Sequence, residues 1–165
     1  MTYNRKNYPL HELIDDAYEA VHSLHTRNVI STEYPSGFTA LGMTTGEIEP
    51  GELIVIASRP SMGKSILAMN IAQFLGANKI PKKVASAIFS LDIPKEQLVM
   101  RMLSATACIS FRRMKTGHLE DSDMLKLNGA KESLRQSEIY IDDTPGIGLI
   151  ELITKVRRLK TDNDV

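Results

Sequence analysis

One short run of residues, 58–65, constrains the fold of this chain more than any other feature. It reads Ser-Arg-Pro-Ser-Met-Gly-Lys-Ser and matches the phosphate-loop pattern G-x-x-x-x-G-K-[ST] at every fixed position except the first, where serine replaces glycine. In such a loop, successive backbone N–H groups and the N-terminus of the following helix surround an anion. The run therefore predicts a triphosphate site at a junction between a strand and a helix.

Each fixed position of the loop has a predicted task. Gly63 lets the backbone approach a phosphate closely, Lys64 reaches the β- and γ-phosphates of ATP, and the Ser65 hydroxyl binds Mg²⁺. Ser58 requires a backbone conformation that a residue with a Cβ can adopt. The alternative is a chance match in a surface turn, which the flanking patterns argue against. The predicted nucleotide-binding residues are Ser58, Arg59, Pro60, Ser61, Met62, Gly63, Lys64 and Ser65.

The residues around the loop alternate between strand-like and helix-like patterns. Continuous apolar residues at 53–57 predict a strand that is buried on both faces, and residues 64–75 predict a helix that is capped by Gly76. Strands that alternate with helices in this way indicate an α/β fold with a mainly parallel sheet flanked by helices. Further strands are expected at 84–91 and 138–142, and further helices at about 94–107, 122–135 and 147–160.

Acidic residues follow the second and third predicted strands. Ligands of open parallel sheets lie beyond the carboxyl ends of the strands, so Asp92 is placed to activate the water that attacks the γ-phosphate. Asp92 is equally well explained as the N-cap of the next helix, which begins with Ile-Pro. Spacing alone leaves both roles open. Asp142 and Asp143 are assigned to turn and cap positions.

The N-terminal part differs in character from the rest. Apolar residues at helical spacing predict an amphipathic helix over 9–25, and prolines and glycines within 26–52 predict a boundary before a domain that begins near Ser31. Acidic and basic residues balance at 20 each, so the net charge gives no information on nucleic-acid binding, and any DNA contact must come from a local patch or from assembly with other subunits. No apolar run has the length of a membrane span, and we expect a cytoplasmic protein with no membrane partner. Cys108 is assigned to packing.

Five segments are collinear from about Ser36 to Lys160: SGFTALGMTTGEIEPGELIVIASRPSMGKSILAMNIAQ, AIFSLDIPKEQLVMRMLSA, FRRMKTGHL, IYIDDTPGI and KVRRLK. Together they closely resemble the C-terminal motor domain of DnaB-type replicative DNA helicases, and RPSMGKS and IYIDDTP are the most distinctive parts. The resemblance implies a RecA-like P-loop NTPase fold and a homo-oligomeric ring of six subunits that binds ATP between neighbours. It also implies movement on single-stranded DNA, with primase and a helicase loader as partners in the primosome.

The resemblance also assigns roles to individual positions. Gly63, Lys64 and Ser65 fall on the family's Walker A residues, and Asp92 falls on its catalytic glutamate. Aspartate keeps the charge but is one methylene shorter, so it holds the attacking water differently. Residues 1–30 resemble the linker helix, which docks on the adjacent subunit of the ring; packing on its own domain is the alternative. Residues 31–165 resemble the first half of the RecA-like ATPase domain.

The family's Walker B aspartate, DNA-binding loops and arginine finger have no counterpart in this sequence. Two hypotheses share every motif above. In the first, the chain is an incomplete domain of an ATP-dependent DNA helicase, in which ATP hydrolysis drives unwinding. In the second, it is a truncated, non-catalytic helicase-like protein that binds or modulates a helicase ring. A different RecA-like ATPase is a third reading, and RPSMGKS and IYIDDTP count against it.

Overall fold

The computed structural model describes residues 9–26, 33–77 and 84–162, and the chain divides into two units, Met1–Thr32 and Glu33–Val165. The described part of the first unit is one helix, whereas the second unit holds the sheet and the other helices. Among the described residues, no helix combines the length and the apolar composition that a membrane span requires.

The helix of the first unit is amphipathic. It is α1 (Leu10–Thr26), which confirms the helix predicted for residues 9–25. Its apolar stripe is exposed: Leu10 is 75% exposed and Val21 is 65% exposed. Burial of such a stripe is what stabilises a surface helix, and the described residues leave this apolar face of α1 uncovered.

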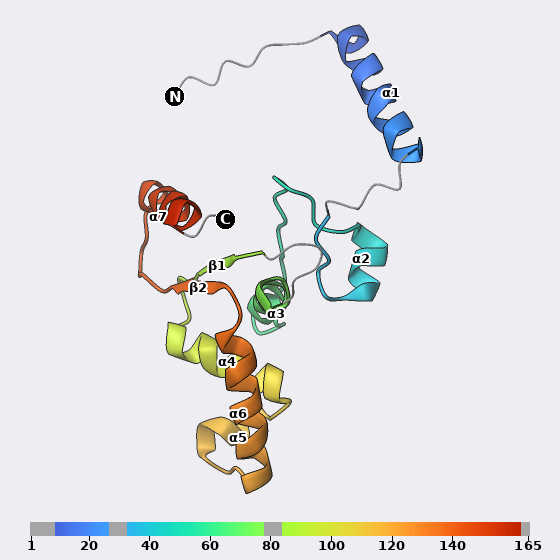
Figure 1. Ribbon diagram of the computed structural model, residues 1–165. Coiled ribbons are helices and arrows are strands. Elements are labelled where there is room, and N and C mark those ends of the chain that lie inside the picture. Colours follow the sequence, from blue (N-terminus) through green and yellow to red (C-terminus); the bar gives the residue numbers. More distant parts are fainter. Residues whose placement is uncertain (1–8, 27–32, 78–83, 163–165) are drawn as a thin grey trace. The chain divides into compact units, whose positions relative to one another are not determined.

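Two short parallel strands form the sheet of the second unit (Figure 1). Strand β1 (Ser86–Phe89) pairs with β2 (Ile139–Asp142), so that Ser86 lies opposite Ile139 and Phe89 lies opposite Asp142. Both strands lie within the segments predicted at 84–91 and 138–142 and are four residues long. Parallel pairing brings the carboxyl ends of β1 and β2 to the same edge of the sheet.

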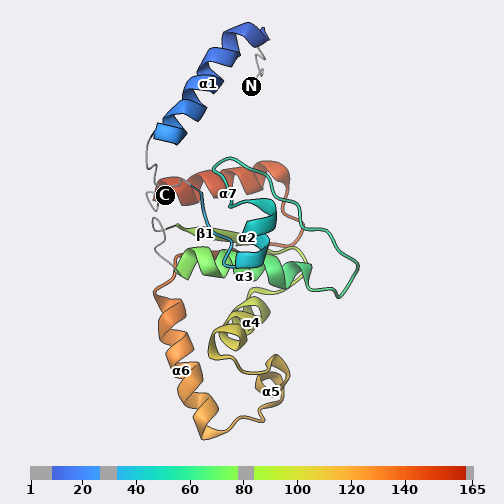
Figure 2. The same ribbon diagram turned by 90° about the vertical axis from the view of Figure 1, so that its right-hand side faces the viewer.

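Helices lie on both sides of this sheet, with α7 (Leu149–Asp162) on one side and α3 (Lys64–Ala77) and α4 (Lys95–Ala107) on the other (Figures 1 and 2). The predicted helices that start after the loop, after β1, before β2 and after β2 are therefore confirmed. Two short helices, α2 and α5, were not expected from the sequence. The helices of the second unit are α2 (Thr39–Thr45), α3 (Lys64–Ala77), α4 (Lys95–Ala107), α5 (Phe111–Thr116), α6 (Asp121–Arg135) and α7 (Leu149–Asp162).

The main core lies between the sheet and the helices on one side of it. Met69 of α3 and Leu98 and Met102 of α4 are buried together, and isoleucines from both strands pack against them. A second small cluster forms where α4 and α6 meet, around Ala107 and Ala130. Burial of these side chains is the main stabilising contribution in this unit.

The strand predicted at residues 53–57 is not formed. Residues 52–58 carry no regular secondary structure, and the side chains of Leu53 and Val55 are 86% and 78% exposed. A strand needs hydrogen-bonded neighbours, and none of the described residues pairs with this segment. The continuous apolar pattern indicates a segment whose two faces would both be buried in a sheet, but it does not determine whether a neighbouring strand is present to pair with it.

Two residue assignments are also wrong. Gly76 does not cap α3: it lies inside the helix and is buried, where a Cβ would come within 2.6 Å of Ile139 Cγ1. Glycine therefore allows α3 to cross close to β2. Cys108 does not pack in the core: it ends α4 in the left-handed conformation (φ 54°), and the residue is exposed.

Candidate functional site

The predicted phosphate loop forms a tight turn that leads into α3. The Met62 N–H donates to the Arg59 carbonyl oxygen at 3.3 Å, and the Leu67 N–H donates to the Gly63 carbonyl oxygen at 2.9 Å. Between these bonds, Ser61 and Gly63 adopt positive φ angles of 63° and 90°. Left-handed residues in a turn bring successive backbone N–H groups toward one concave side, which is the geometry of an anion-binding nest.

The start of α3 presents unpaired donors. The backbone N–H groups of Gly63, Lys64, Ser65 and Ile66 have no acceptor in the part of the chain that the structure describes. Free N–H groups and the helix dipole both favour an anion at this end of a helix. Lys64 and Ser65 are themselves exposed, so the ammonium and the hydroxyl are accessible at the same place. This loop has the chemistry that a phosphate group requires.

The serine that replaces the first glycine of the pattern adopts an ordinary conformation. The described non-glycine residues with positive φ are Ser61 and Cys108, so Ser58 is not among them. This confirms the expectation for its backbone. The Ser58 hydroxyl donates to the Arg59 carbonyl oxygen at 3.0 Å, which leaves it inside the turn.

One cavity brings the phosphate loop and the end of β1 together. Ser65 and Asp92 both line a space of about 440 Å³ between α3 and the sheet. The other seven residues of the loop are not part of its lining. Asp92 is exposed, and its carboxylate has no hydrogen bond to another described residue. A carboxylate and a phosphate-loop hydroxyl that face one cavity can act on the same end of a triphosphate: the hydroxyl through a metal ion at the β- and γ-phosphates, and the carboxylate through the water that attacks the γ-phosphate.

Asp92 is not the N-cap of α4. Pro94 occupies the N-cap position and makes no side-chain capping bond. The carboxylate of Asp143 caps this helix instead, because its Oδ2 accepts the Lys95 N–H at 3.1 Å. Of the two roles left open for Asp92, the structure excludes the cap.

Asp143 and Lys95 were not predicted to meet. The Lys95 ammonium lies 3.3 Å from Asp143 Oδ1, so one side chain holds both the backbone and the side chain of Lys95. The hydrogen bond and the negative charge of Asp143 raise the pKa of Lys95, and the Lys95 N–H lowers the pKa of Asp143. The two residues are 48 positions apart, so no local pattern could reveal the pair.

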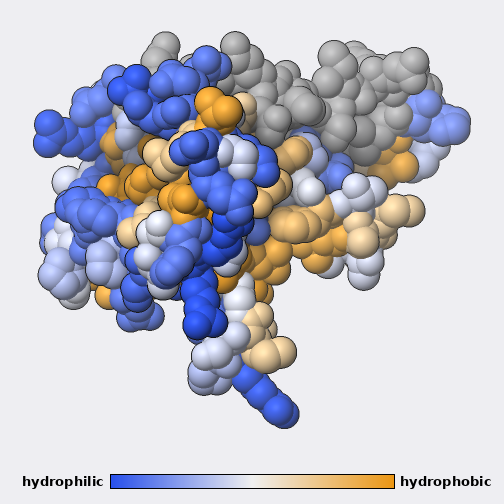
Figure 3. Space-filling view, turned by 90° about the horizontal axis from the view of Figure 1, so that it is seen from below, coloured by the Kyte–Doolittle hydropathy of each residue, from blue (hydrophilic) through white to orange (hydrophobic). Residues whose placement is uncertain are grey.

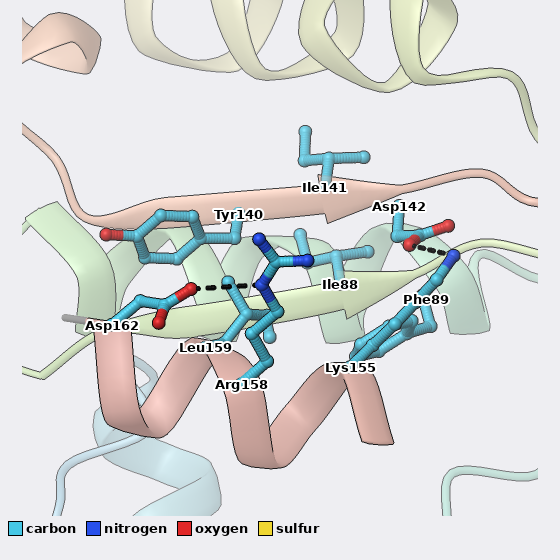
Figure 4. Close-up of a pocket in the computed structure, with 10 residues that line it drawn as sticks. Ile88, Phe89, Tyr140, Ile141, Asp142, Lys155, Arg158, Leu159 and Asp162 are labelled. Atoms are coloured by element: carbon cyan, nitrogen blue, oxygen red, sulfur yellow. Dashed lines mark hydrogen bonds and ion pairs between the residues drawn. The ribbon is translucent and has the colours of Figure 1, made fainter. Parts of the chain in front are cut away.

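Asp142 is a turn residue, as predicted, and also an ion-pair partner. Its Oδ1 accepts the Thr144 N–H at 2.9 Å, and its Oδ2 lies 2.6 Å from the Lys155 ammonium of α7 (Figure 4). The hydrogen bond from Lys155, followed by those from Thr144, lowers the pKa of Asp142 to about 2. This pair is drawn at one end of a crevice of about 300 Å³ between α7 and the sheet.

The described residues offer few protein ligands for a metal ion. Among the described residues, no three His, Cys, Asp or Glu side chains are arranged to hold a metal ion. Mg²⁺ in nucleotide sites keeps waters and takes phosphate oxygens together with one or two protein ligands. The exposed Ser65 hydroxyl is compatible with such a shared site.

A phosphate loop that opens a helix beside parallel strands, with an acidic residue beyond a strand end, is typical of P-loop NTPases, of which the RecA-like proteins are one class. Two solved structures support this class. The first is described as an ATPase domain and superposes with a TM-score of 0.76 at 26% identity, covering 95% of this chain and 54% of that one. The structure of a DnaB-like replicative helicase and its interactions with primase gives a TM-score of 0.81 at 26% identity, covering 95% and 36%.

Residues 34–165 match the family described as the DnaB-like helicase C terminal domain, and the chain belongs to this family. It is 44% identical to the replicative DNA helicase DnaC of Bacillus subtilis over 163 residues. It is 41% identical to the replicative DNA helicase DnaB of Geobacillus stearothermophilus over 152 residues. These alignments cover 96% and 92% of this chain but 35% and 33% of the relatives, so the chain spans about a third of their length.

Proposed function

We propose that this chain forms the nucleotide-binding part of a replicative DNA helicase motor, which uses ATP and Mg²⁺. The observation that carries the proposal is the shared cavity, in which Ser65 of the phosphate loop and Asp92 of the β1 end face the same space. Membership of the DnaB-like family supports it, because replicative helicases couple nucleotide use to DNA unwinding.

In this proposal each residue of the site acts on one part of the nucleotide. The free N–H groups at the start of α3 bind phosphate oxygens, Lys64 neutralises charge on the β- and γ-phosphates, and Ser65 supplies one oxygen to the metal ion. Bound Mg²⁺ supplies charge neutralisation at the phosphates. The Asp92 carboxylate orients a water and accepts its proton. The remaining loop residues, Ser58, Arg59, Pro60, Ser61 and Met62, shape the turn.

The setting of the motor is part of the same proposal. We place the chain in a homo-oligomeric ring, a hexamer, that moves on single-stranded DNA in the cytoplasm. One solved relative is described with its interactions with primase, which supports primase as a partner, and a helicase loader is the further partner that the family resemblance implies. The exposed stripe of α1 supports contact with a neighbouring subunit.

The first test is nucleotide binding by the 165-residue chain. Lys64→Ala removes the ammonium that faces the phosphates, so the affinity for Mg·ATP should fall at least about tenfold, as expected for loss of a charge-assisted bond. Isothermal titration with Mg·ATP measures this change. Lys126→Ala, which removes an exposed lysine from α6, is the matched control and should bind like the parent chain. Equal affinities of the Lys64 variant and the parent would remove the phosphate-loop assignment.

A second function follows from the exposed apolar surface. Large apolar side chains of the second unit remain open, including Leu53, Val55 and Leu91, and apolar side chains gather on the face shown in Figure 3. Such surface favours a binding module that joins or modulates a helicase ring without turnover. Binding of Mg·ATP with no hydrolysis, together with a change in the ATPase rate of an added replicative helicase, would select this second function.

A further inference from the structure

Two consecutive aspartates at the end of β2 each hold a different helix. Asp142 binds Lys155 of α7 at 2.6 Å, and Asp143 binds Lys95 at the start of α4 through the backbone N–H at 3.1 Å and the ammonium at 3.3 Å. The side chain of Asp143 is 26% exposed, so its bonds are partly shielded from water. Asp143 therefore acts as a helix cap that comes from a different part of the chain.

This remote cap matters because α4 has no local one. Its N-cap residue is Pro94, which carries no side-chain oxygen and makes no capping bond. Loss of a capping carboxylate leaves the first N–H groups of a helix unpaired and frays its first turn. The position of the first turn of α4 thus depends on Asp143 and on the buried Leu98 that follows.

The segment between β1 and α4 is also held at its other end. The Ser90 N–H donates to the Asp142 carbonyl oxygen at 2.8 Å, which extends the pairing of the strands. The Ser90 hydroxyl donates to the Ile93 carbonyl oxygen at 2.6 Å and accepts the Ile93 N–H at 3.2 Å. Residues 90–94 are therefore fixed by β2 on one side and by the Asp143 cap on the other.

Asp92 lies in the middle of this held segment. Its carboxylate makes no hydrogen bond to the described residues, so its place in the cavity is set by the backbone of residues 90–94 and not by side-chain partners. An unsupported carboxylate can act as a base only if its backbone is fixed, because small displacements of a catalytic group cost large factors in rate.

We propose that Asp143 is a positioning residue for Asp92: by capping α4 it fixes the segment 90–94 and aims the Asp92 carboxylate into the cavity shared with Ser65. The proposal rests on the proposed role of Asp92 in water activation. Asp143 itself contacts neither the nucleotide nor the attacking water, and its effect on turnover passes through the backbone of residues 90–94.

The first measurement needs no activity. Amide chemical shifts and hydrogen exchange of the ¹⁵N-labelled 165-residue chain report the segment directly. Asp143→Ala should change the signals of Leu91, Asp92 and Ile93 and speed their exchange, whereas Asp143→Asn keeps a capping oxygen and should stay close to the parent. Asp121→Ala, which removes an exposed aspartate from the start of α6, is the control and should leave this segment unchanged.

A change confined to the Lys95 amide, with the signals of residues 91–93 unaltered, would overturn the positioning role whether or not the chain hydrolyses ATP. Global unfolding of the Asp143→Ala variant would show in all signals. In that case Ser90→Ala, which removes the hydrogen bonds of the Ser90 hydroxyl at the other end of the segment, is the second variant. It should change the amide signal and speed the exchange of Asp92; an unchanged Asp92 amide would show that the segment is not held as proposed.

The second measurement links the segment to turnover in the polypeptide that carries this sequence. Asp143→Ala should lower kcat roughly ten- to a hundredfold, which is less than the roughly 10²–10⁴-fold contribution of a general base because the carboxylate of Asp92 is displaced and not removed. KM for Mg·ATP should stay unchanged because the phosphate loop is untouched. Asp143→Asn should restore most of kcat. In a variant that already carries Asp92→Ala, Asp143→Ala should not lower kcat further, because both substitutions remove the same contribution to catalysis. If the two substitutions lower kcat additively, Asp143 does not act through Asp92 and the proposal is overturned. If Asp92→Ala alone leaves kcat unchanged, the proposed role of Asp92 in water activation is wrong, whereas the capping of α4 by Asp143 still stands.

Discussion

Two residues of the phosphate loop carry its unusual backbone. Ser61 and Gly63 both have positive φ, and the Cβ of Ser61 makes its left-handed conformation costly by about 1 kcal/mol or more. Such strain persists where the surrounding turn and helix enforce it. At Gly63 a Cβ would meet no atom within 4 Å, so space does not require glycine there. The φ angle of 90° requires glycine, because residues with a Cβ rarely adopt it.

We therefore predict that Gly63→Ala disturbs nucleotide binding more than folding. The alanine must adopt a left-handed backbone or change the path of the loop, at a cost of about 1–2 kcal/mol, and the N–H groups then no longer converge. Titration with Mg·ATP should show at least a roughly tenfold loss of affinity. The control is Gly129→Ala, in helix α6 and with no atom near the new methyl group, which should raise stability by about 0.5–1 kcal/mol. Parent-like affinity of Gly63→Ala would contradict this role of its backbone.

The helices and strands that their own residue pattern indicates could be predicted, whereas features that depend on residues far away in the sequence could not. The strands at 84–91 and 138–142 and the helices around them follow from local pattern. Ser65 and Asp92 line one cavity although the strand expected to lead into the loop is not formed, so packing of α3 against the sheet brings them together. The run 53–57 has a strand's composition, but pairing depends on neighbours that its residues do not encode.

The contacts that sequence reasoning missed join distant positions. The cap of α4 by Asp143 spans 48 residues, and the pattern Asp-Ile-Pro made Asp92 the natural local cap. Gly76 was assigned to a helix end because glycine commonly ends helices, whereas here its missing side chain lets α3 approach Ile139. In each case tertiary packing decided a role that local preference had assigned elsewhere.

The ion pair that joins α7 to β2 predicts a pH dependence. The folded pKa of Asp142 is about 2, below its ordinary 3.8, so the stabilisation is fully present above pH 3.8 and is lost as the pH falls through about 2. Lys155→Met removes the donor, so its unfolding temperature should fall less steeply than that of the parent between about pH 4 and 2. The pKa of Lys155 is raised above its ordinary 10.5, so the ion pair also makes stability depend on pH on the alkaline side. This stabilisation is fully present below pH 10.5 and is lost as the pH rises through the folded pKa of Lys155.

Thermal unfolding followed by circular dichroism over this pH range makes the comparison. Arg158→Met is the matched control, because the Arg158–Asp162 pair lies within α7 and both side chains are more than half exposed. Exposed pairs of this spacing contribute little to stability, so the acid limb of this variant should parallel that of the parent. Parallel acid limbs for Lys155→Met and the parent would show that the pair does not stabilise the fold.

At the scale of the whole molecule, the described chain leaves apolar faces open in both units. Leu53 and Val55 are exposed in the second unit, and the α1 stripe is exposed in the first. Monomers seldom leave large apolar patches uncovered unless they bind something. The proposed ring provides a reason, because neighbouring subunits of an oligomer cover such faces.

The last prediction concerns the stripe of α1 and self-association. Ile14→Lys with Val21→Lys places charges on the apolar face while lysine keeps good helix propensity, and each lost apolar contact costs about 1.5–3 kcal/mol if it is buried between copies. Sedimentation velocity over a concentration series should therefore show at least a roughly tenfold weaker association. Glu12→Lys with Glu19→Lys changes the opposite face of the helix and should associate like the parent. A parent chain that stays monomeric, or equal association of both double variants, would rule out contact between copies through α1.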